Sequence, residues 1–171
     1  MRRGARSFYE RRIMRILGID PGYGRLGIAV IDAEKGKKEI LVHSECFETS
    51  SKTEHGERLR LIKEKVKEVI ETYSPGLVGI ESLLFSTNKK TAIAVAEARG
   101  AILSEIAAHS IKIKEYNPGS IKIAVTGHGK SDKEQVKKMI EIIVGRKFTK
   151  TLDDECDAIA VALTVAATER F

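Results

Sequence analysis

The chain has 171 residues, of which 42% are hydrophobic and 32% are charged. A chain of this length can bury a sizeable core, and this composition is typical of globular proteins rather than disordered ones. The sequence contains no apolar run near the roughly 20 residues that a membrane-spanning helix needs. Cys46 and Cys156 are too few for a disulfide framework and lack metal-ligand spacing, so the sequence predicts a cytoplasmic protein.

The first 13 residues, MRRGARSFYERRI, carry five arginines and one glutamate, which accounts for most of the formal net charge of +6. They lack the apolar region of a secretory signal. Met14 opens directly on an apolar strand. We therefore interpret residues 1–13 as a basic extension, either an alternative start or a flexible arm, and residues 14–171 as one domain.

Three strands are expected first, at residues 15–20, 25–32 and 39–47. The glycine turn PGYG joins the first two and the segment AEKGKK joins the second pair, which suits an antiparallel meander. Residues 55–73 then repeat apolar side chains at helical spacing, with Lys and Glu between them. This pattern predicts an amphipathic helix, and a short apolar strand at 77–81 follows it.

The rest of the chain is expected to form four helices and one strand, so that the whole is a mixed sheet with helices packed on it. Ser131 and Glu134 have the spacing of a capping box, which would open the third of these helices. The last helix is apolar nearly all round after Asp157, which predicts burial. The expected ranges are 88–109 (helix), 111–116 (strand), 120–125 (helix), 131–144 (helix) and 152–168 (helix).

Carboxylates end two of the central strands at the same relative place: ILGID ends in Asp20 and LVGIE ends in Glu81. If these strands lie side by side in register, both acids project from one sheet edge, where α/β proteins place their sites. Asp154 and Asp157 share one face of the last helix. Four acids together raise one another's pKa or require a cation, and hard oxygen ligands select Mg²⁺ or Mn²⁺. Two such ions can assist a phosphodiester displacement.

Simpler interpretations exist for single acids. In the functional interpretation a rigid strand holds Asp20 as a bridging carboxylate, and Gly22 and Gly24 let a backbone pass close by, whereas in the simpler one Asp20 is a turn aspartate before Pro-Gly. Asp154 could be a helix N-terminal acid capped by Thr151. Glu81 is harder to explain in this way, because an acid at the end of a buried strand needs a partner. The coincidence of all these acids on the expected elements favours a functional site.

Basic residues cluster between residues 112 and 150, where ten Lys and Arg stand against four acids. Such a segment would meet a polyanionic partner, although a solvated helix face would explain the charge alone.

Four segments resemble, in order and spacing, the signature blocks of the RuvC family, the bacterial Holliday-junction resolvases: MRILGIDPGYGRLGIAV, GIESLLFSTNKKTAIAVAEARGAI, KIAVTGHGKSDKEQV and DECDAIAVAL. The resemblance runs from Met14 to about Thr168. It implies an RNase H-like α/β fold whose five-stranded mixed sheet has its first three strands antiparallel. It also implies a homodimer that nicks two opposing strands of a four-way DNA junction symmetrically, in recombination and repair, leaving a 5′-phosphate and a 3′-hydroxyl.

The resemblance also implies roles for individual residues. The acids are expected to be catalytic and to hold two Mg²⁺ ions, for which Mn²⁺ can substitute. Lys122 and Lys133 fall on the family's basic positions near the scissile phosphate. The helix after Glu81 is expected at the dimer interface, and the RuvA–RuvB branch-migration complex is an expected partner. The acids are Asp20, Glu81, Asp154 and Asp157, and further DNA contacts are expected at Phe85, Lys89 and Lys130.

The sequence departs from the family pattern at three places. Many members have an aromatic residue three positions after the second acid, where Leu84 stands here. The next residue, Phe85, is expected to stack on a base at the junction centre, with a core role as the alternative. Glu155 and Cys156 replace small residues, and Glu155 is expected to face outward without becoming a ligand. His128 is expected to be a loop residue or a phosphate contact.

Three other classes of protein stay open. An actin-like or sugar-kinase ATPase shares the strand-Asp-x-Gly start but needs a second domain. A catalytically silent junction- or RNA-binding module would keep the fold without the chemistry. A related nuclease would act on RNA or on other branched DNA.

Overall fold

A computed structural model of the chain describes residues 13–82, 89–149 and 153–169. Its centre is a five-stranded sheet in the order β3-β2-β1-β4-β5. β1 is antiparallel to β2 and β2 to β3, whereas β4 is parallel to β1 and β5 to β4. This arrangement confirms the predicted mixed sheet. The strands are β1 (Met14–Asp20), β2 (Arg25–Ala33), β3 (Ile40–Glu48), β4 (Leu77–Glu81) and β5 (Lys112–Tyr116).

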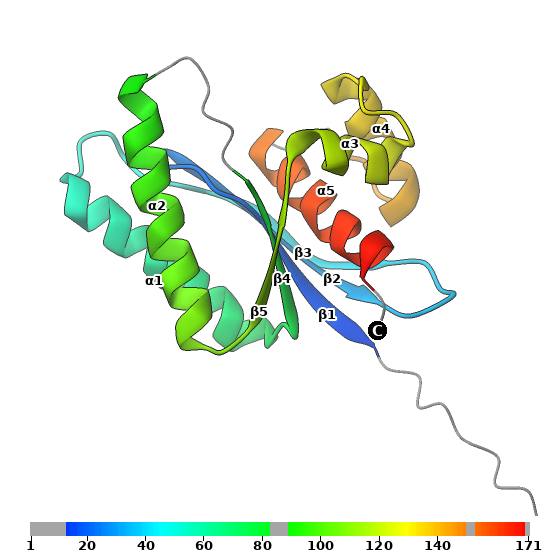
Figure 1. Ribbon diagram of the computed structural model, residues 1–171, viewed down its shortest axis with the longest axis horizontal. Helices are drawn as coiled ribbons and strands as arrows, with labels where there is room; N and C mark the ends of the chain where they lie inside the picture. The colour runs from blue at the N-terminus through cyan, green and yellow to red at the C-terminus, as the bar shows by residue number, and fades with distance from the viewer. Residues whose placement is uncertain (1–12, 83–88, 150–152, 170–171) are drawn as a thin grey trace, which may run out of the picture.

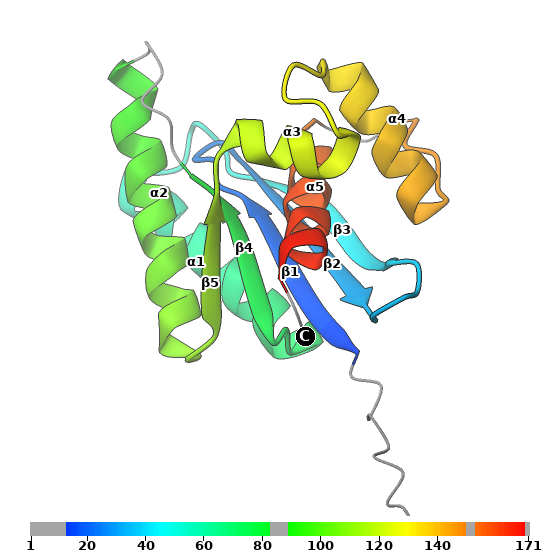
Figure 2. The same cartoon turned by 45° about the vertical axis from the view of Figure 1, so that its right-hand side comes forward.

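Helices cover both faces of the sheet (Figures 1 and 2). α1 (His55–Tyr73) and α2 (Lys89–Ala108) pack on one face. On the other face α5 (Asp153–Thr168) lies directly against β1, β2 and β4, and α3 (Pro118–Thr126) and α4 (Lys133–Val144) pack on α5. Within the described residues, no helix is long and apolar enough to cross a membrane.

The central strands contribute side chains to two buried clusters, because successive side chains of a strand point to opposite faces of the sheet. Leu17 and Ile19 of β1 join the cluster under α1 and α2. Ile16 joins the cluster around α5, whose residues 158–165 are all buried. Burial on both faces explains why the central strands are nearly continuous apolar runs.

Two helix starts differ from the sequence prediction. α3 begins at Pro118, two residues early, because the Asn117 side chain caps it by accepting a hydrogen bond from the Ser120 amide at 2.8 Å. The predicted Ser131–Glu134 capping box of α4 is wrong. Asp132 and Gln135 form the box, because the buried Ser131 hydroxyl is instead hydrogen-bonded to the Thr126 hydroxyl at 2.7 Å. Thr151, the expected cap of α5, lies outside the described residues.

Candidate active site

The sheet brings the first two acids together. The parallel register of β1 and β4 pairs Ile19 with Ile80, so Asp20 and Glu81 follow at the same end of neighbouring strands. Both lie on the α5 face, because Gly18 and Gly79, two residues earlier in each strand, pack against α5. The predicted adjacency of the two strands is therefore present.

Three glycines let α5 lie very close to the sheet. A Cβ atom added at Gly18 would overlap the Ala158 carbonyl, and one at Gly79 would overlap the Val165 side chain. A Cβ atom at Gly27, which pairs with Asp20 across β1 and β2, would overlap the carbonyl of Asp154. Only glycine allows this approach. We call Gly18, Gly27 and Gly79 the glycine seat. It brings the first turn of α5 to the end of β1.

The acids influence one another strongly, and we call Asp20, Glu81, Asp154 and Asp157 the acid cluster. Burial, followed by the negative charges of Asp157, Glu81 and Asp154, raises the pKa of Asp20 to about 8. Burial and Asp157 raise the pKa of Glu81. Burial also raises the pKa of Asp157, and Asp154 adds to that effect. The neutral form is favoured because water is excluded and like charges are near.

The acid cluster has the chemistry of a divalent-cation site. The Oδ2 atom of Asp154 is buried and has no hydrogen-bond partner among the described residues. The Nε atom of Arg25 lies 3.2 Å from it, but the two are not aligned as a hydrogen bond. Carboxylate oxygens are the ligands that Mg²⁺ and Mn²⁺ prefer, and a cation would relieve the repulsion among the acids.

These acids are neighbours rather than a finished coordination shell. In the described part of the chain, no three His, Cys, Asp or Glu side chains are already arranged to hold one metal ion. Four like charges in one place repel. A bound cation would have to draw their side chains inward.

Two lysines stand beside the acid cluster. A cavity of about 190 Å³ is lined by Glu81, Asp157, Lys122 and Lys133 together with apolar side chains. Both lysines oppose the rise in the pKa of Glu81. The Nζ atom of Lys133 also lies 3.1 Å from Oδ2 of Asp153. The structure therefore brings both predicted lysines to the acids.

Of the other predicted DNA contacts, the structure describes the surroundings of only some. Lys130 and His128 line a second cavity of about 490 Å³ between the α3–α4 loop and α4, which Thr126 and Lys138 also line. Phe85 and Leu84 lie outside the described residues. Lys89 opens α2, but its side chain is outside the described part.

Some site residues were missed by sequence reasoning. Arg25, beside Asp154, carries no periodic signal, and only its place after the glycine turn could have drawn attention to it. Gly18 and Gly79 did carry a signal, because each stands two residues before an acid in the repeated pattern Gly-Ile-acid. Glu155 does not face outward as predicted: it is half-buried, and its Oε1 accepts a hydrogen bond from the Ser44 hydroxyl of β3 at 2.6 Å.

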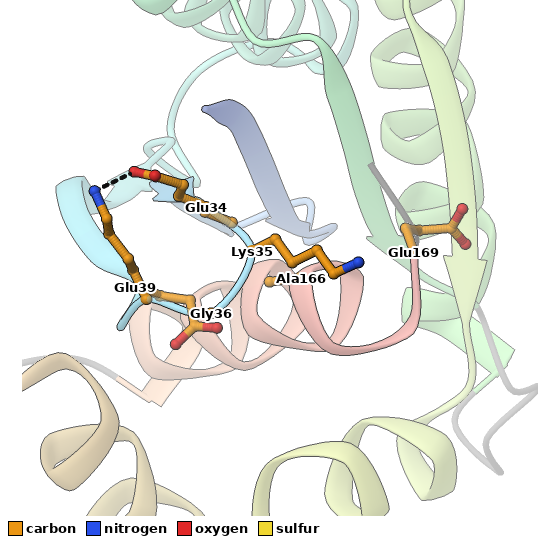
Figure 3. A pocket seen from close by; sticks show the side chains of 8 residues that line it. Glu34, Lys35, Gly36, Glu39, Ala166 and Glu169 are labelled. Atoms are coloured by element: carbon orange, nitrogen blue, oxygen red, sulfur yellow. Dashed lines mark ion pairs between the residues drawn. The ribbon is translucent and has the colours of Figure 1, made fainter. Parts of the chain in front are cut away.

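A cavity at the other end of the α5 face lacks the features of a divalent-cation site. It measures about 400 Å³ and lies between the β2–β3 hairpin and the C-terminal end of α5, as Figure 3 shows. Two acids at its rim already have lysine partners. Glu34 is 2.8 Å from Lys37, and Glu169 is 2.8 Å from Lys114. The acid cluster remains the candidate active site.

Comparisons with known proteins show the family of this chain. The family model "Crossover junction endodeoxyribonuclease RuvC" matches residues 16–165. A relative of that name from Petrotoga mobilis is 43% identical over 149 residues, covering 87% of this chain and 91% of its own. One from Brachyspira hyodysenteriae is 40% identical over 155 residues, covering 91% and 95%.

Solved structures give the same result. The structure of Thermus thermophilus RuvC is similar with a TM-score of 0.82 and 34% identity, covering 90% of this chain and 93% of its own. The T. thermophilus RuvC in complex with Holliday junction substrate is similar with a TM-score of 0.85 and the same identity and coverage. The yeast mitochondrial Holliday junction resolvase Ydc2, at 13% identity and a TM-score of 0.68, shares the fold.

Proposed function

The chain belongs to the RuvC family of crossover junction endodeoxyribonucleases, and from this premise we propose that the acid cluster is the centre with which it resolves Holliday junctions. The chain is a hydrolase that binds four-way junction DNA and cuts its phosphodiester bonds. We also propose a cytoplasmic setting for it. The observation that carries the assignment is the register of Asp20 beside Glu81, with the first turn of α5 held over them by the glycine seat.

The acid cluster would hold the metal. Two Mg²⁺ ions, or Mn²⁺ in their place, would supply an activated water and charge stabilisation at the leaving oxygen. The chain's own residues prepare this chemistry: burial and the neighbouring acids raise the pKa of Asp20, and a bound cation would favour its charged carboxylate. Burial keeps water away from the carboxylates and strengthens their attraction for the ion.

The two lysines would act on the DNA side. Lys122 of α3 and Lys133 of α4 line the same cavity as Glu81 and Asp157, where a scissile phosphate would add further negative charge. Their ammonium groups would offset this charge as it develops in the transition state. We propose that the neighbouring cavity with Lys130 and His128 receives an adjacent phosphate. Lys89 and Phe85 are further proposed contacts, Phe85 at the junction centre.

Symmetric cutting needs two sites, and α2 offers a surface for a second copy. Ile93 is 69% exposed, and Ala96, Gly100 and Ser104 follow on the same exposed side of the helix. A Cβ atom at Gly100 would meet nothing within 4 Å, so nothing within the described chain explains a glycine in mid-helix. Small residues allow helices to approach closely. We propose a homodimer through this face, with a RuvA–RuvB-type complex as a further partner.

A cleavage comparison tests the proposed function. End-labelled four-way junction, linear duplex and RNA–DNA hybrid would be incubated with the protein in Mg²⁺, and Asp20→Asn would be run in parallel. We expect paired nicks at symmetric positions of the junction, none with chelator, and none from the variant. Equal cutting of duplex or hybrid would reassign the substrate, and tight junction binding without cutting in Mg²⁺ or Mn²⁺ would indicate a silent binding module.

A further inference from the structure

The turn that follows Asp20 is fastened to the end of β3. The Thr49 hydroxyl donates a hydrogen bond to the Tyr23 carbonyl at 2.7 Å, and the Thr49 amide donates to the Gly24 carbonyl at 2.9 Å. The turn is also tight, because a Cβ atom at Gly22 would overlap the carbonyl of Arg25. The backbone after Asp20 thus has fixed partners outside its own strand pair.

Arg58 of α1 holds the ring of Tyr23. Its guanidinium carbon lies 3.7 Å from the ring centroid, within the range of a cation–π interaction. The same guanidinium donates hydrogen bonds to the Thr49 hydroxyl at 3.0 Å and to the Tyr23 carbonyl at 3.3 Å. One face of the ring is therefore covered from within the protein, which makes Tyr23 a poor stacking platform for a DNA base.

The hydroxyl of Tyr23 begins a chain of contacts to α2. It lies 2.8 Å from Nδ1 of His55, and Nε2 of His55 lies 3.0 Å from Oε2 of Glu97. A neutral imidazole satisfies both contacts when Tyr23 donates to Nδ1 and the Nε2 hydrogen is donated to Glu97. His55 is the first residue of α1 and Glu97 lies on the exposed side of α2. Side chains from three elements meet here.

We propose that this tyrosine clamp, formed by Tyr23, Thr49, His55, Arg58 and Glu97, is a positioning device for Asp20 and couples it to α2. The inference rests on the proposed role of Asp20 as a metal ligand. A bound cation would have to draw the side chains of the acid cluster together, and Asp20 is joined directly to the clamped turn. A loosened turn would let Asp20 move and would weaken cation binding. The clamp residues touch none of the four acids in the contacts of the described chain, so their role is positioning.

The sharpest test removes one oxygen atom. Tyr23→Phe keeps the ring under Arg58 and deletes the bond to His55. We expect direct Mn²⁺ binding, followed by electron paramagnetic resonance, to weaken about threefold to tenfold, the effect of one net hydrogen bond. The Mg²⁺ concentration for half-maximal cleavage should rise by the same factor. The cleavage rate at saturating Mg²⁺ and junction binding in chelator should stay at the wild-type level.

Matched variants separate the clamp from a general loss of stability. Tyr73→Phe deletes the same atom from a tyrosine that stacks on His43 at the other end of α1, and should leave Mn²⁺ affinity unchanged. Glu97→Gln keeps an acceptor for His55 and should bind Mn²⁺ like the wild type, whereas Glu97→Leu should weaken binding. The double variant Tyr23→Phe with Glu97→Leu should be no weaker than the worse single variant, because both break one chain of bonds.

Unchanged Mn²⁺ affinity in Tyr23→Phe would overturn the proposal, and so would a fall in melting temperature with no change in affinity. Failure of the proposed function looks different. If the wild-type protein bound Mn²⁺ through Asp20 but cut no junction, the proposed function would be wrong. The effect of the clamp variants on Mn²⁺ affinity could still be measured.

Discussion

The carboxyl group of Asp20 shows how much a single residue can contribute to this site. Its pKa of about 8 lies above the ordinary value of 3.8. Between these two pH values the folded metal-free protein therefore holds a proton on Asp20 that the unfolded chain has released. The stability associated with this proton is present below about pH 4 and is lost as the pH rises toward 8. Removing the charge of Asp20 should therefore increase the free energy of unfolding of the metal-free protein most near pH 8.

Asp20→Asn is accordingly expected to stabilise the metal-free protein at pH 8 by about 1–3 kcal/mol, because the amide carries no charge to be buried among acids. At pH 5 the gain should be clearly smaller, and below about pH 4 it should vanish, because the unfolded chain then also holds a proton on Asp20. Thermal unfolding in chelator at both pH values measures this, and cleavage should be absent throughout while junction binding persists. A lower melting temperature of the variant at pH 8 would contradict the assignment of Asp20 to a buried acid cluster.

Lys133 is the residue whose removal should affect cleavage without removing a proposed ligand. Lys133→Met is expected to slow cleavage about 100-fold, the typical effect of losing one group that stabilises transition-state charge. Asp153→Asn, which frees Lys133 from its ion pair, should keep the wild-type rate. Lys67→Met, on α1 beside Glu71, is the matched control on the other face of the sheet. Equal rates for Lys133→Met and Lys67→Met in single-turnover assays would rule out the proposed role of Lys133.

At the scale of elements, the position of α5 on the sheet decides where two of the four acids lie. Gly27→Ala adds one methyl group under the carbonyl of Asp154 and should lift the first turn of α5 from β2. We expect cleavage at saturating Mn²⁺ to fall about 100-fold, as for a misplacement of about 1 Å, with a stability loss of about 1–3 kcal/mol. Single-turnover rates and thermal unfolding measure the two effects.

Gly24→Ala is the control for that substitution. Its added Cβ would meet only the Arg58 side chain, at the ordinary distance of 3.8 Å. It should cleave at nearly the wild-type rate. If Gly27→Ala cleaved as fast as Gly24→Ala, α5 would not depend on the glycine seat for its position.

The sequence could predict the elements that have local signals, but not the contacts that depend on packing. α1 and β4 have the predicted bounds, because a long amphipathic period and a short buried run are local signals. The register of Asp20 beside Glu81 followed from two strands with the same Gly-Ile-acid ending. The glycine seat depends on how closely a helix approaches a sheet, which no local pattern encodes. The tyrosine clamp joins Tyr23 to residues 26 to 35 positions away in the chain. The capping box of α4 moved by one residue because the Ser131 hydroxyl is hydrogen-bonded to Thr126 of the preceding helix.

For the whole molecule, the question is how one active site per chain produces two symmetric cuts. The exposed side of α2 is the surface proposed for the second copy, and Glu97 of the tyrosine clamp lies on that side as well. A dimer formed there would connect each metal site to the interface through Glu97, His55 and Tyr23. Assembly and metal affinity would then be coupled, and dissociation of the dimer would weaken Mn²⁺ binding.

Ile93→Glu tests the proposed interface, because a charge at the centre of a helix–helix contact costs more than it does in water. We expect a monomer by sedimentation at concentrations where the wild type is a dimer. On a supercoiled plasmid with a cruciform, the variant should give nicked circles in place of linear product, since the two strands are no longer cut together. Ile40→Glu on β3, where the isoleucine is 64% exposed, is the control and should stay dimeric. A dimeric Ile93→Glu that still linearises the plasmid would move the interface away from α2 and leave Glu97 with a role inside one chain only.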